Sequence, residues 1–368
     1  MKIKAAVVHE KGDPFVFEEV ELQEPKGDEL LVRVVASGIC GTDEGARSGE
    51  LPVSFPSVFG HEGAGVVEKV GACVKEFEVG DHVAFSYAFC GICDCCHSGE
   101  PAHCQNFMKI NFGGTSSDGT TRIKQNGKDV AMFFGQSSFA EYSIVHTNSA
   151  VKVDKDIDLG IAAPLGCGIQ TGAGTVLNTL RPKISDTIAI FGCGAVGLSA
   201  LMGAKVAGCE KIIAVGGNAQ SLELAKELGA THTINRKDVD DITEEIKAIT
   251  NGKGVNFAVD TSGYGPMIEK AIKSLSWQGI MAALSPSGKL NEFKIGEDIL
   301  MGMRTIKGVN EGDSVAKVFI PELLEYYKRG EFPIDKLITY YEFEELEKAL
   351  EDSNKGKVIK PVLRISKQ

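Results

Sequence analysis

The chain has 368 residues, of which 43% are hydrophobic and 24% charged, and its formal net charge at pH 7 is −11. This length exceeds what one hydrophobic core usually organises, so two domains are expected. The acidic balance argues against nucleic acid and anionic membranes as partners, because both require a basic face. The N-terminal apolar run is too short for a signal peptide, and four glycines interrupt the long uncharged stretch 187–204. We therefore expect a cytoplasmic protein with no membrane span.

The first part of the chain has the residue pattern that is typical of a β domain. Residues 1–150 contain short β-branched runs separated by turn residues, at 1–10, 30–35, 63–67 and 81–85. This spacing predicts a mainly antiparallel β domain. The segment 104–138 is polar and rich in Gly and Ser, which predicts a long loop or lobe.

Half of the ten cysteines lie between residues 90 and 104. Cysteines without a secretory signal favour metal binding or catalysis over disulfides. The spacing C-x2-C-x2-C-x7-C suits one tetrahedral zinc ion closed by protein ligands, that is, a structural site at Cys90, Cys93, Cys96 and Cys104. Cys95 is an alternative third ligand, and His97 and His103 are weaker substitutes.

From about residue 170, apolar runs of strand length alternate with helical patterns. Strands are predicted at 187–191, 211–215, 232–234 and 256–260, and helices at 198–207, 221–228, 242–249 and 266–275. This alternation predicts a doubly wound parallel sheet, so the fold class is α/β.

The sequence GCGAVG at residues 192–197 matches the pattern G-x-G-x-x-G. It follows a predicted buried strand and opens an apolar helix, the context of a dinucleotide-binding turn. Gly192 permits the tight turn, Gly194 lets the backbone approach the pyrophosphate, and Gly197 lets the helix pack closely. The phosphates are then expected at the helix N-terminus.

The next strand ends without the acidic residue that hydrogen-bonds the ribose of NAD. Gly216, Gly217 and Asn218 stand there instead. The missing carboxylate removes a repulsion against a 2′-phosphate, and Asn218, Gln220 and Ser221 are candidate donors to it. No Arg is expected near enough to pair with that phosphate. NADP(H) is favoured, and NAD(H) is the alternative.

Three dispersed segments complete the motif set. They are GICGTD around Cys40, GHE containing His61 and Glu62, and GCGIQT around Cys167. Sequence spacing alone does not bring them together. With the four-cysteine loop, the dinucleotide turn and the ending GKVIKP at 356–361, the chain resembles the zinc-containing medium-chain alcohol dehydrogenases over nearly its whole length. The segments 133–139 and 166–174 are similar to the aryl (benzyl) alcohol dehydrogenase branch.

The resemblance implies a GroES-like β catalytic domain over 1–169, a Rossmann domain over 170–310, and a return to the catalytic domain over 311–368. It implies two zinc ions per subunit, the catalytic one held by Cys40, His61 and Cys167. Asp43 would orient His61, Glu62 would lie behind the zinc, and Thr42 would take the proton of the alcohol. Contacts with the cofactor are implied for Thr171 and Val196 near the nicotinamide and for Lys360 at the pyrophosphate.

Two departures from the family stand out. Gly41 occupies a position where many relatives carry a basic residue, which removes one phosphate contact. Gly45 stands where the well-studied animal enzymes end the proton relay in a histidine. Glu44, water or the ribose hydroxyl are the alternatives for the end of the relay.

The family positions of the substrate pocket are Leu51, Ser86, Phe133 and Phe134. Two phenylalanines suit a flat apolar substrate, so benzyl-, cinnamyl- or geraniol-like primary alcohols and their aldehydes are predicted. Ordinary core packing is the competing explanation of both rings. The alternative functions are an S-hydroxymethylglutathione (formaldehyde) dehydrogenase and a non-catalytic, zinc-stabilised dinucleotide sensor. A homo-oligomer, dimer or tetramer, is expected; the run 278–284 is a candidate sheet edge and equally suits a buried strand.

Overall fold

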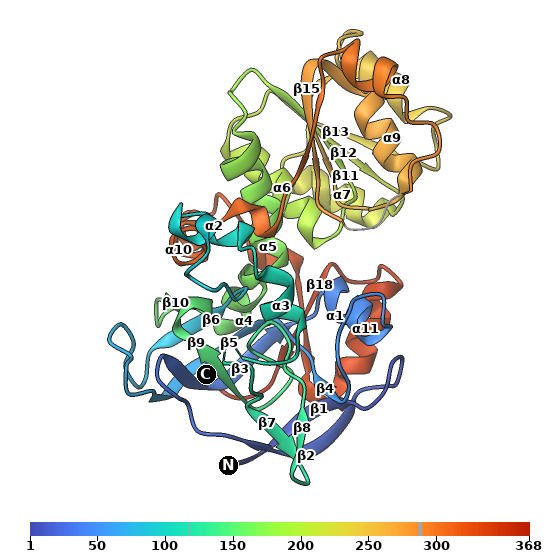
Figure 1. The fold of residues 1–368 in the computed structure, drawn as a ribbon. Helices are drawn as coiled ribbons and strands as arrows, with labels where there is room; N and C mark the ends of the chain where they lie inside the picture. Colours follow the sequence, from blue (N-terminus) through green and yellow to red (C-terminus); the bar gives the residue numbers. More distant parts are fainter. Residues whose placement is uncertain (117, 286–288) are drawn as a thin grey trace. The chain divides into compact units, whose positions relative to one another are not determined.

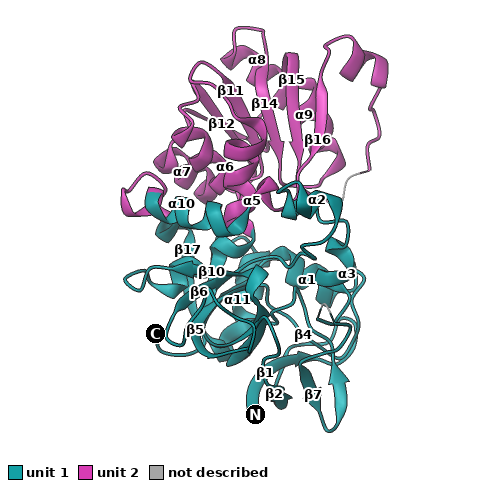
Figure 2. Ribbon diagram, turned by 60° about the vertical axis from the view of Figure 1, so that its left-hand side comes forward, with its two compact units in different colours: residues 1–167, 315–325, 334–368 teal, residues 168–314, 326–333 magenta. Residues whose placement is uncertain are grey.

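The computed structural model describes residues 1–116, 118–285 and 289–368, and the chain divides into two compact units (Figure 2). Unit 1 comprises residues 1–167, 315–325 and 334–368, and unit 2 comprises residues 168–314 and 326–333. The sequence placed the divisions after residues 169 and 310. The short return of 326–333 to unit 2 was not predicted.

Unit 1 is built on two sheets (Figure 1). The five-stranded sheet has the order β4-β1-β2-β7-β8, with bounds β4 (Ser57–Val58), β1 (Lys2–Val8), β2 (Val16–Leu22), β7 (Ile123–Gln125) and β8 (Lys128–Val130). The seven-stranded sheet has the order β10-β6-β5-β3-β18-β17, with β9 also paired to β3. Its bounds are β10 (Ala150–Val153), β6 (His82–Phe85), β5 (Glu62–Val70), β3 (Glu29–Gly38), β18 (Lys360–Arg364), β17 (Ile338–Glu342) and β9 (Tyr142–His146). Most pairs are antiparallel, and β17 with β18 is parallel, so the predicted mainly antiparallel domain is confirmed.

The described chain segments of unit 1 contain five α-helices of four to nine residues and the longer α10, whose last three residues belong to unit 2. Their bounds are α1 (Gly41–Arg47), α2 (Asp94–His97), α3 (Phe107–Phe112), α4 (Leu159–Ala162), α10 (Ala316–Lys328) and α11 (Leu346–Asn354). The segment 104–138, predicted as a loop or lobe, contains α3 and the hairpin of β7 and β8. The prediction of a continuous loop was wrong because this hairpin lies at the margin of the sheet, where half of each strand is accessible and polar residues are tolerated.

Unit 2 contains a six-stranded parallel sheet with the order β13-β12-β11-β14-β15-β16. The bounds are β13 (His232–Asn235), β12 (Lys211–Gly216), β11 (Thr187–Phe191), β14 (Val255–Asp260), β15 (Leu275–Ala283) and β16 (Thr305–Gly308). The helices are α5 (Gly168–Gly174), α6 (Ala195–Val206), α7 (Ala219–Leu228), α8 (Ile242–Ile249) and α9 (Gly265–Lys273). This strand order, 3-2-1-4-5-6 in chain sequence, is that of the dinucleotide-binding doubly wound fold, and the predicted fold class is confirmed.

The central strands of unit 2 are apolar along their length because helices cover both faces. In β11 the side chains of residues 188–191 are all buried, and Ala189 and Phe191 join Ile213 and Val215 of β12 in one core cluster. Strand β15 pairs with β14 on one side and β16 on the other, so the run 278–284 belongs to an interior strand. Within the described residues, the two edge strands of the sheet are β13 and β16. No helix in the described ranges is both long enough and apolar enough to cross a membrane.

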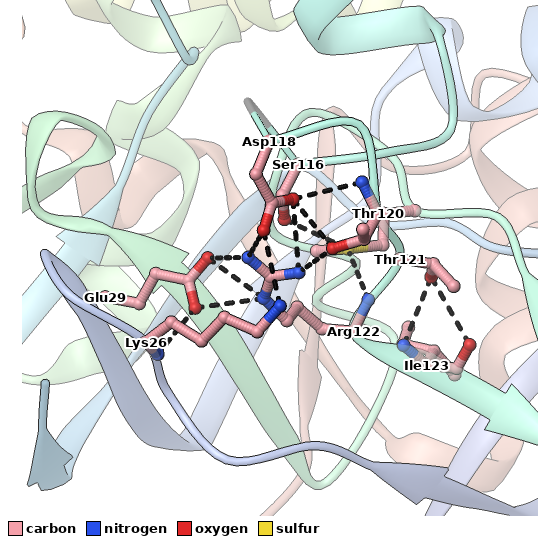
Figure 3. A network of polar contacts seen from close by, with 9 residues as sticks. Lys26, Glu29, Ser116, Asp118, Thr120, Thr121, Arg122 and Ile123 are labelled. Atoms are coloured by element: carbon pink, nitrogen blue, oxygen red, sulfur yellow. Dashed lines mark hydrogen bonds and ion pairs between the residues drawn. The ribbon is translucent and has the colours of Figure 1, made fainter.

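A buried ion pair connects residues 118–122 to the start of β3 (Figure 3). The guanidinium of Arg122, only 2% exposed, donates to both carboxylate oxygens of Glu29 at 2.6 to 3.0 Å and to Asp118 Oδ2 at 2.9 Å. Lys26 adds a backbone hydrogen bond to Glu29 at 2.8 Å. Burial alone would raise the pKa of Asp118, but hydrogen bonds from Arg122 and Thr120 hold that pKa well below its usual range. The carboxylate of Asp118 therefore stays charged and paired with Arg122.

We predict that Glu29→Gln lowers the free energy of unfolding by about 3 kcal/mol, because it leaves the buried Arg122 without its principal counter-charge. Urea denaturation measures this change. Arg122→Met/Glu29→Gln should cost less than the sum of the two single changes, since neither charge is then left unpaired. Lys124→Met, which removes an exposed cation 3.6 Å from Asp129, is the control and should change stability by less than about 1 kcal/mol. Equal effects of Glu29→Gln and the control would contradict the interpretation.

Candidate active site and metal centres

Four side chains of unit 1 form the first candidate metal centre: Cys40, His61, Glu62 and Cys167. One ligand atom from each lies within 4.8 Å of all the others. The antiparallel pairing of β3 with β5 places Gly38 opposite Glu62, which brings Cys40, two residues after Gly38, close to His61. Cys167 follows the 3-10 turn Ala163–Gly166 and is buried. The structure thus brings together residues that sequence spacing could not.

The imidazole of His61 is oriented by Asp43. Asp43 Oδ1 lies 2.9 Å from His61 Nδ1 and also accepts a hydrogen bond from the backbone of Gly60 at 3.1 Å. The opposite ring nitrogen, Nε2, is buried without a hydrogen-bond partner in the part of the chain that the structure describes. Burial alone would lower the pKa of His61, but the charge and hydrogen bond of Asp43 raise it well above its ordinary value. A ring fixed at Nδ1, with Nε2 aimed into a cysteine cluster, is the geometry of a metal ligand.

The thiol of Cys40 is predisposed to ionise. A hydrogen bond with Cys167 lowers the pKa of Cys40 well below its ordinary value, and the charge of Lys360 acts in the same direction. Thiolates are the form in which cysteine binds metals. Two thiolates and one imidazole leave a fourth tetrahedral position open, which is the pattern of a catalytic zinc site. The donor set therefore fits zinc.

Glu62 is held by a buried lysine. Lys360 Nζ donates to both carboxylate oxygens of Glu62 at 2.8 and 2.9 Å and to the carbonyl of Ile39 at 3.0 Å. Burial alone would lower the pKa of Lys360, but the charge of Glu62 raises it. These three bonds use all the donors of an ammonium group. The contact of Lys360 with the pyrophosphate stays a prediction, and it requires Lys360 to exchange one of these partners.

Gly38 makes room for this ion pair. A Cβ atom at Gly38 would lie 2.1 Å from Glu62 Oε2, so any side chain there would displace the carboxylate. The close approach of β3 to Glu62 therefore depends on this glycine.

Cys90, Cys93, Cys96 and Cys104 form the second candidate metal centre. Their sulfur atoms lie 3.9 Å apart for Cys90 and Cys96, 3.5 Å for Cys93 and Cys96, and 4.0 Å for Cys93 and Cys104. A tetrahedral zinc ion with bonds of about 2.3 Å sets its sulfur ligands about 3.8 Å apart, so the cluster fits zinc. Helix α2 carries Cys96 to the cluster, one turn after Cys93. Cys95 is outside both groups found among the described residues, so Cys96 is the third ligand of the arrangement.

Two aromatic rings pack against the imidazole of His61. The ring of Phe134 lies 4.6 Å from the imidazole, and that of Phe133 lies 5.5 Å away and nearly perpendicular. Both phenylalanines are buried, and they also contact Phe112. Of the other predicted pocket residues, Ser86 is buried and donates to the carbonyl of Gly166 at 3.0 Å, next to Cys167, and Leu51 is half-buried.

Gln136 is a supporting residue that the sequence reasoning missed. Its amide nitrogen donates to the carbonyl of His61 at 2.9 Å, and its amide oxygen accepts from the backbone of Gly63 at 3.2 Å. It thereby fixes the backbone on both sides of Glu62. The available signal was a lone amide side chain within the aromatic run 133–139, because a buried amide must be hydrogen-bonded.

The predicted proton relay begins next to the first metal ligand. Thr42 Oγ1 lies 3.7 Å from Cys40 Sγ. Glu44, one alternative for the end of the relay, accepts two hydrogen bonds from Arg47 at 2.8 and 3.0 Å. Its carboxylate is therefore engaged in an ion pair, which favours water or the ribose hydroxyl as the next group.

The dinucleotide turn of unit 2 has the geometry that the glycine pattern predicts. Gly192 has a φ of 108°, and a Cβ there would lie 2.3 Å from Thr261 Oγ1. A Cβ at Gly197 would lie 1.9 Å from the carbonyl oxygen of Gly192. At Gly194, no described heavy atom lies within 4 Å of a Cβ position, so the backbone is open to a ligand. Gly194 also precedes helix α6, whose N-terminus favours a pyrophosphate.

Two other predicted cofactor residues lie near this turn. Helix α5 packs against α6 so closely that a Cβ at Gly172 would lie 2.0 Å from the carbonyl oxygen of Val196. Thr171 precedes Gly172, and its hydroxyl lies 3.4 Å from the carboxylate of the buried Glu311. Their contact with the nicotinamide stays a prediction.

The residues that follow β12 correct the expectation that no Arg lies near the position of a 2′-phosphate. Asn218 caps helix α7, accepting hydrogen bonds from the backbone of Gln220 and Ser221 at 2.9 and 3.3 Å. No Arg was expected here, but a Cβ at Gly217 would lie only 2.6 Å from Nε of Arg236. Arg236 was overlooked because it follows the next strand, β13, which the parallel sheet places beside β12.

Known proteins resemble the chain over its full length. It matches the family models described as alcohol dehydrogenase GroES-like domain, over residues 26–155, and zinc-binding dehydrogenase, over residues 195–326. It is 40% identical to a geraniol dehydrogenase of Castellaniella defragrans over 98% of this chain and 97% of that one. A benzyl alcohol dehydrogenase of Acinetobacter calcoaceticus superposes with a TM-score of 0.95 at 44% identity, covering 100% of both chains. An alcohol dehydrogenase zinc-binding domain protein of Burkholderia ambifaria superposes with a TM-score of 0.96, also at 44% identity and 100% coverage of both chains.

We predict that the purified protein contains two zinc ions per chain. Cys96→Ser should retain one ion, because it removes a ligand of the four-sulfur cluster, and should unfold at a lower temperature. Cys95→Ser is the matched control and should retain both ions. Elemental analysis of the desalted proteins measures the stoichiometry. Loss of an ion from the Cys95 variant, with both kept by the Cys96 variant, would reverse the assignment.

Proposed function

Because this chain belongs to the zinc-dependent medium-chain alcohol dehydrogenases, as its motifs predicted, we propose that it interconverts primary aryl or allylic alcohols and their aldehydes with NADP(H) in preference to NAD(H). The observation that carries the substrate class is the pair Phe133 and Phe134 packed on His61. The relatives named for benzyl alcohol and geraniol support the same class. The support for NADP(H) is the pair Gly216 and Gly217, which leaves the end of β12 without a carboxylate.

The reaction separates a hydride and a proton. Zinc held by Cys40, His61 and Cys167 would supply Lewis acidity toward the alcohol oxygen, and a dinucleotide bound at the turn 192–197 would supply the hydride acceptor. Thr42 is placed beside Cys40 to accept the hydroxyl proton at Oγ1 while its own hydroxyl proton passes on toward solvent. The products are the aldehyde, the reduced cofactor and one proton.

The other residues of the centre hold this arrangement in place. Asp43 keeps the Nδ1 proton on His61, so Nε2 remains available as a ligand. Lys360 balances the charge of Glu62 beside two thiolates. The buried rings of Phe133 and Phe134 exclude water from one side of His61, which strengthens electrostatic interactions there.

The first measurement is kcat/KM for benzyl alcohol and ethanol, each with NADP+ and with NAD+. We expect benzyl alcohol to be preferred over ethanol by about 100-fold or more, since burial of a ring contributes about 3 kcal/mol. NADP+ should be preferred over NAD+. Thr42→Val should lose about 100-fold or more in kcat, because it lacks the relay hydroxyl, whereas Thr42→Ser should keep most of the activity.

Faster turnover of ethanol or a polyol than of benzyl alcohol would contradict the aryl assignment. A preference for NAD+ would contradict the cofactor assignment while leaving the dehydrogenase intact.

We also propose that the protein forms a homo-oligomer through the edge strand β16. All four residues of β16 are exposed, and its Ile306 lies in a part of the chain with other exposed apolar side chains, Trp277, Leu300, Met301 and Met303. An exposed edge strand with apolar side chains beside it is a template for pairing with a second copy. Sedimentation analysis should show an oligomer for the native protein and smaller species for Ile306→Lys. A monomeric native protein would contradict this proposal.

The proposed setting is the cytosol, where thiols stay reduced. All ten cysteines are free thiols in the structure, and seven of them are assigned to the two zinc centres or stand beside them: Cys40, Cys90, Cys93, Cys95, Cys96, Cys104 and Cys167.

A further inference from the structure

The first residues after β12 and β13 lie side by side. The two strands are parallel, with Gly216 opposite Asn235, and the backbone N–H of Arg236 donates to the carbonyl of Gly216 at 2.8 Å. The side chain of Arg236 then occupies the space that a side chain at Gly217 would fill. A Cβ at Gly217 would lie 2.6 Å from Nε, 3.2 Å from Cζ and 3.3 Å from Nη2 of Arg236.

This guanidinium is available to a ligand. Arg236 is exposed, and its side chain makes no hydrogen bond or ion pair with any residue that the structure describes. Asp238, the nearest acid along the chain, accepts a hydrogen bond from Asn235 Nδ2 at 2.7 Å. The Cys193 thiol beside Gly216 carries no charge at pH 7, because burial raises its pKa to about 12.

The neighbouring position leaves little room for an acidic residue. A Cβ at Gly216 would lie 3.1 Å from Cys193 Sγ and 3.2 Å from Leu222 Cδ2. A side chain at Gly216 would therefore require Cys193 and Leu222 to shift by a few tenths of an ångström, and the position where NAD-specific sheets of this type carry a carboxylate holds none. The end of β12 therefore carries no acidic side chain and has the guanidinium of Arg236 beside it.

We propose that Arg236 binds the 2′-phosphate of NADP(H) and determines the cofactor preference; this inference rests on the proposed nicotinamide dependence. In this fold the adenosine ribose is expected at the end of the second strand, and an Arg there accommodates the 2′-phosphate. A planar guanidinium donates two parallel hydrogen bonds to a phosphate, which a lysine does not. Gly217 contributes by having no side chain between the guanidinium and the ligand.

The test separates the ribose phosphate from the reaction. Calorimetric titration of the zinc-loaded protein with 2′,5′-ADP and with 5′-ADP measures binding at this position without an alcohol. Arg236→Ala should weaken binding of 2′,5′-ADP by about 10- to 100-fold and change binding of 5′-ADP by less than about twofold. Lys237→Ala, which removes the adjacent exposed cation, is the matched control and should have the smaller effect on 2′,5′-ADP.

A second variant tests the role of the glycine. Gly217→Asp should displace and neutralise Arg236 and favour 5′-ADP over 2′,5′-ADP. The proposal is overturned if Arg236→Ala weakens both nucleotides equally or neither, or if Lys237→Ala causes the larger loss. Tighter binding of 5′-ADP than of 2′,5′-ADP by the native protein overturns both this proposal and the NADP(H) preference. The benzyl alcohol assignment is judged separately, by comparison of alcohols with a saturating cofactor.

Discussion

Three donors from two segments of the chain converge on the carboxylate of Asp43. The backbone of Cys40 donates to Oδ2 at 3.0 Å, and the backbone of Gly60 and the ring of His61 approach Oδ1 at 3.1 and 2.9 Å. The carboxylate is buried, so each of these hydrogen bonds is charge-assisted in a medium of low dielectric constant. One side chain thus joins the start of α1 to the residue before β5 and selects the histidine nitrogen that remains free for a metal. The proposed roles of Cys40 and His61 as zinc ligands depend on this constraint.

Charge balance explains the residues around that constraint. Two thiolates and Glu62 place three negative charges in a buried space, which is unfavourable without compensation. A zinc dication would offset the two thiolates, and Lys360 offsets Glu62. Gly38 is required by the same ion pair, because the Glu62 carboxylate lies where a side chain at residue 38 would be. The centre therefore requires a buried cation as well as metal ligands, and Lys360 supplies it.

Local patterns in the sequence predicted the elements whose chemistry is local. The four-cysteine spacing and the turn at 192–197 each lie within a short segment, and the alternating apolar runs predicted β11, β12, β13 and β14 to within one residue. Strand β15 begins three residues before the run 278–284, and β16 was not predicted. The convergence of Cys40, His61 and Cys167 was predicted only through the family resemblance, because the register of β3 against β5 is set by tertiary pairing. Gln136 and the Glu44–Arg47 pair escaped prediction because hydrogen bonds of buried or paired side chains depend on which backbone groups lie opposite.

Arg236 shows why such omissions occur at functional positions. The strand that ends at Gly216 lacks the acidic residue, and no cation follows it directly. The cation, Arg236, lies twenty residues after Gly216 in the sequence. Parallel strands in register place their carboxyl ends together, so the residue that follows one strand is a spatial neighbour of the residue that follows the next. Removing two side chains from one strand end opens space, and the adjacent strand end supplies the charge. The cofactor specificity of such a site is therefore determined by the residues at two neighbouring strand ends. A sequence motif confined to one strand contains only some of those residues.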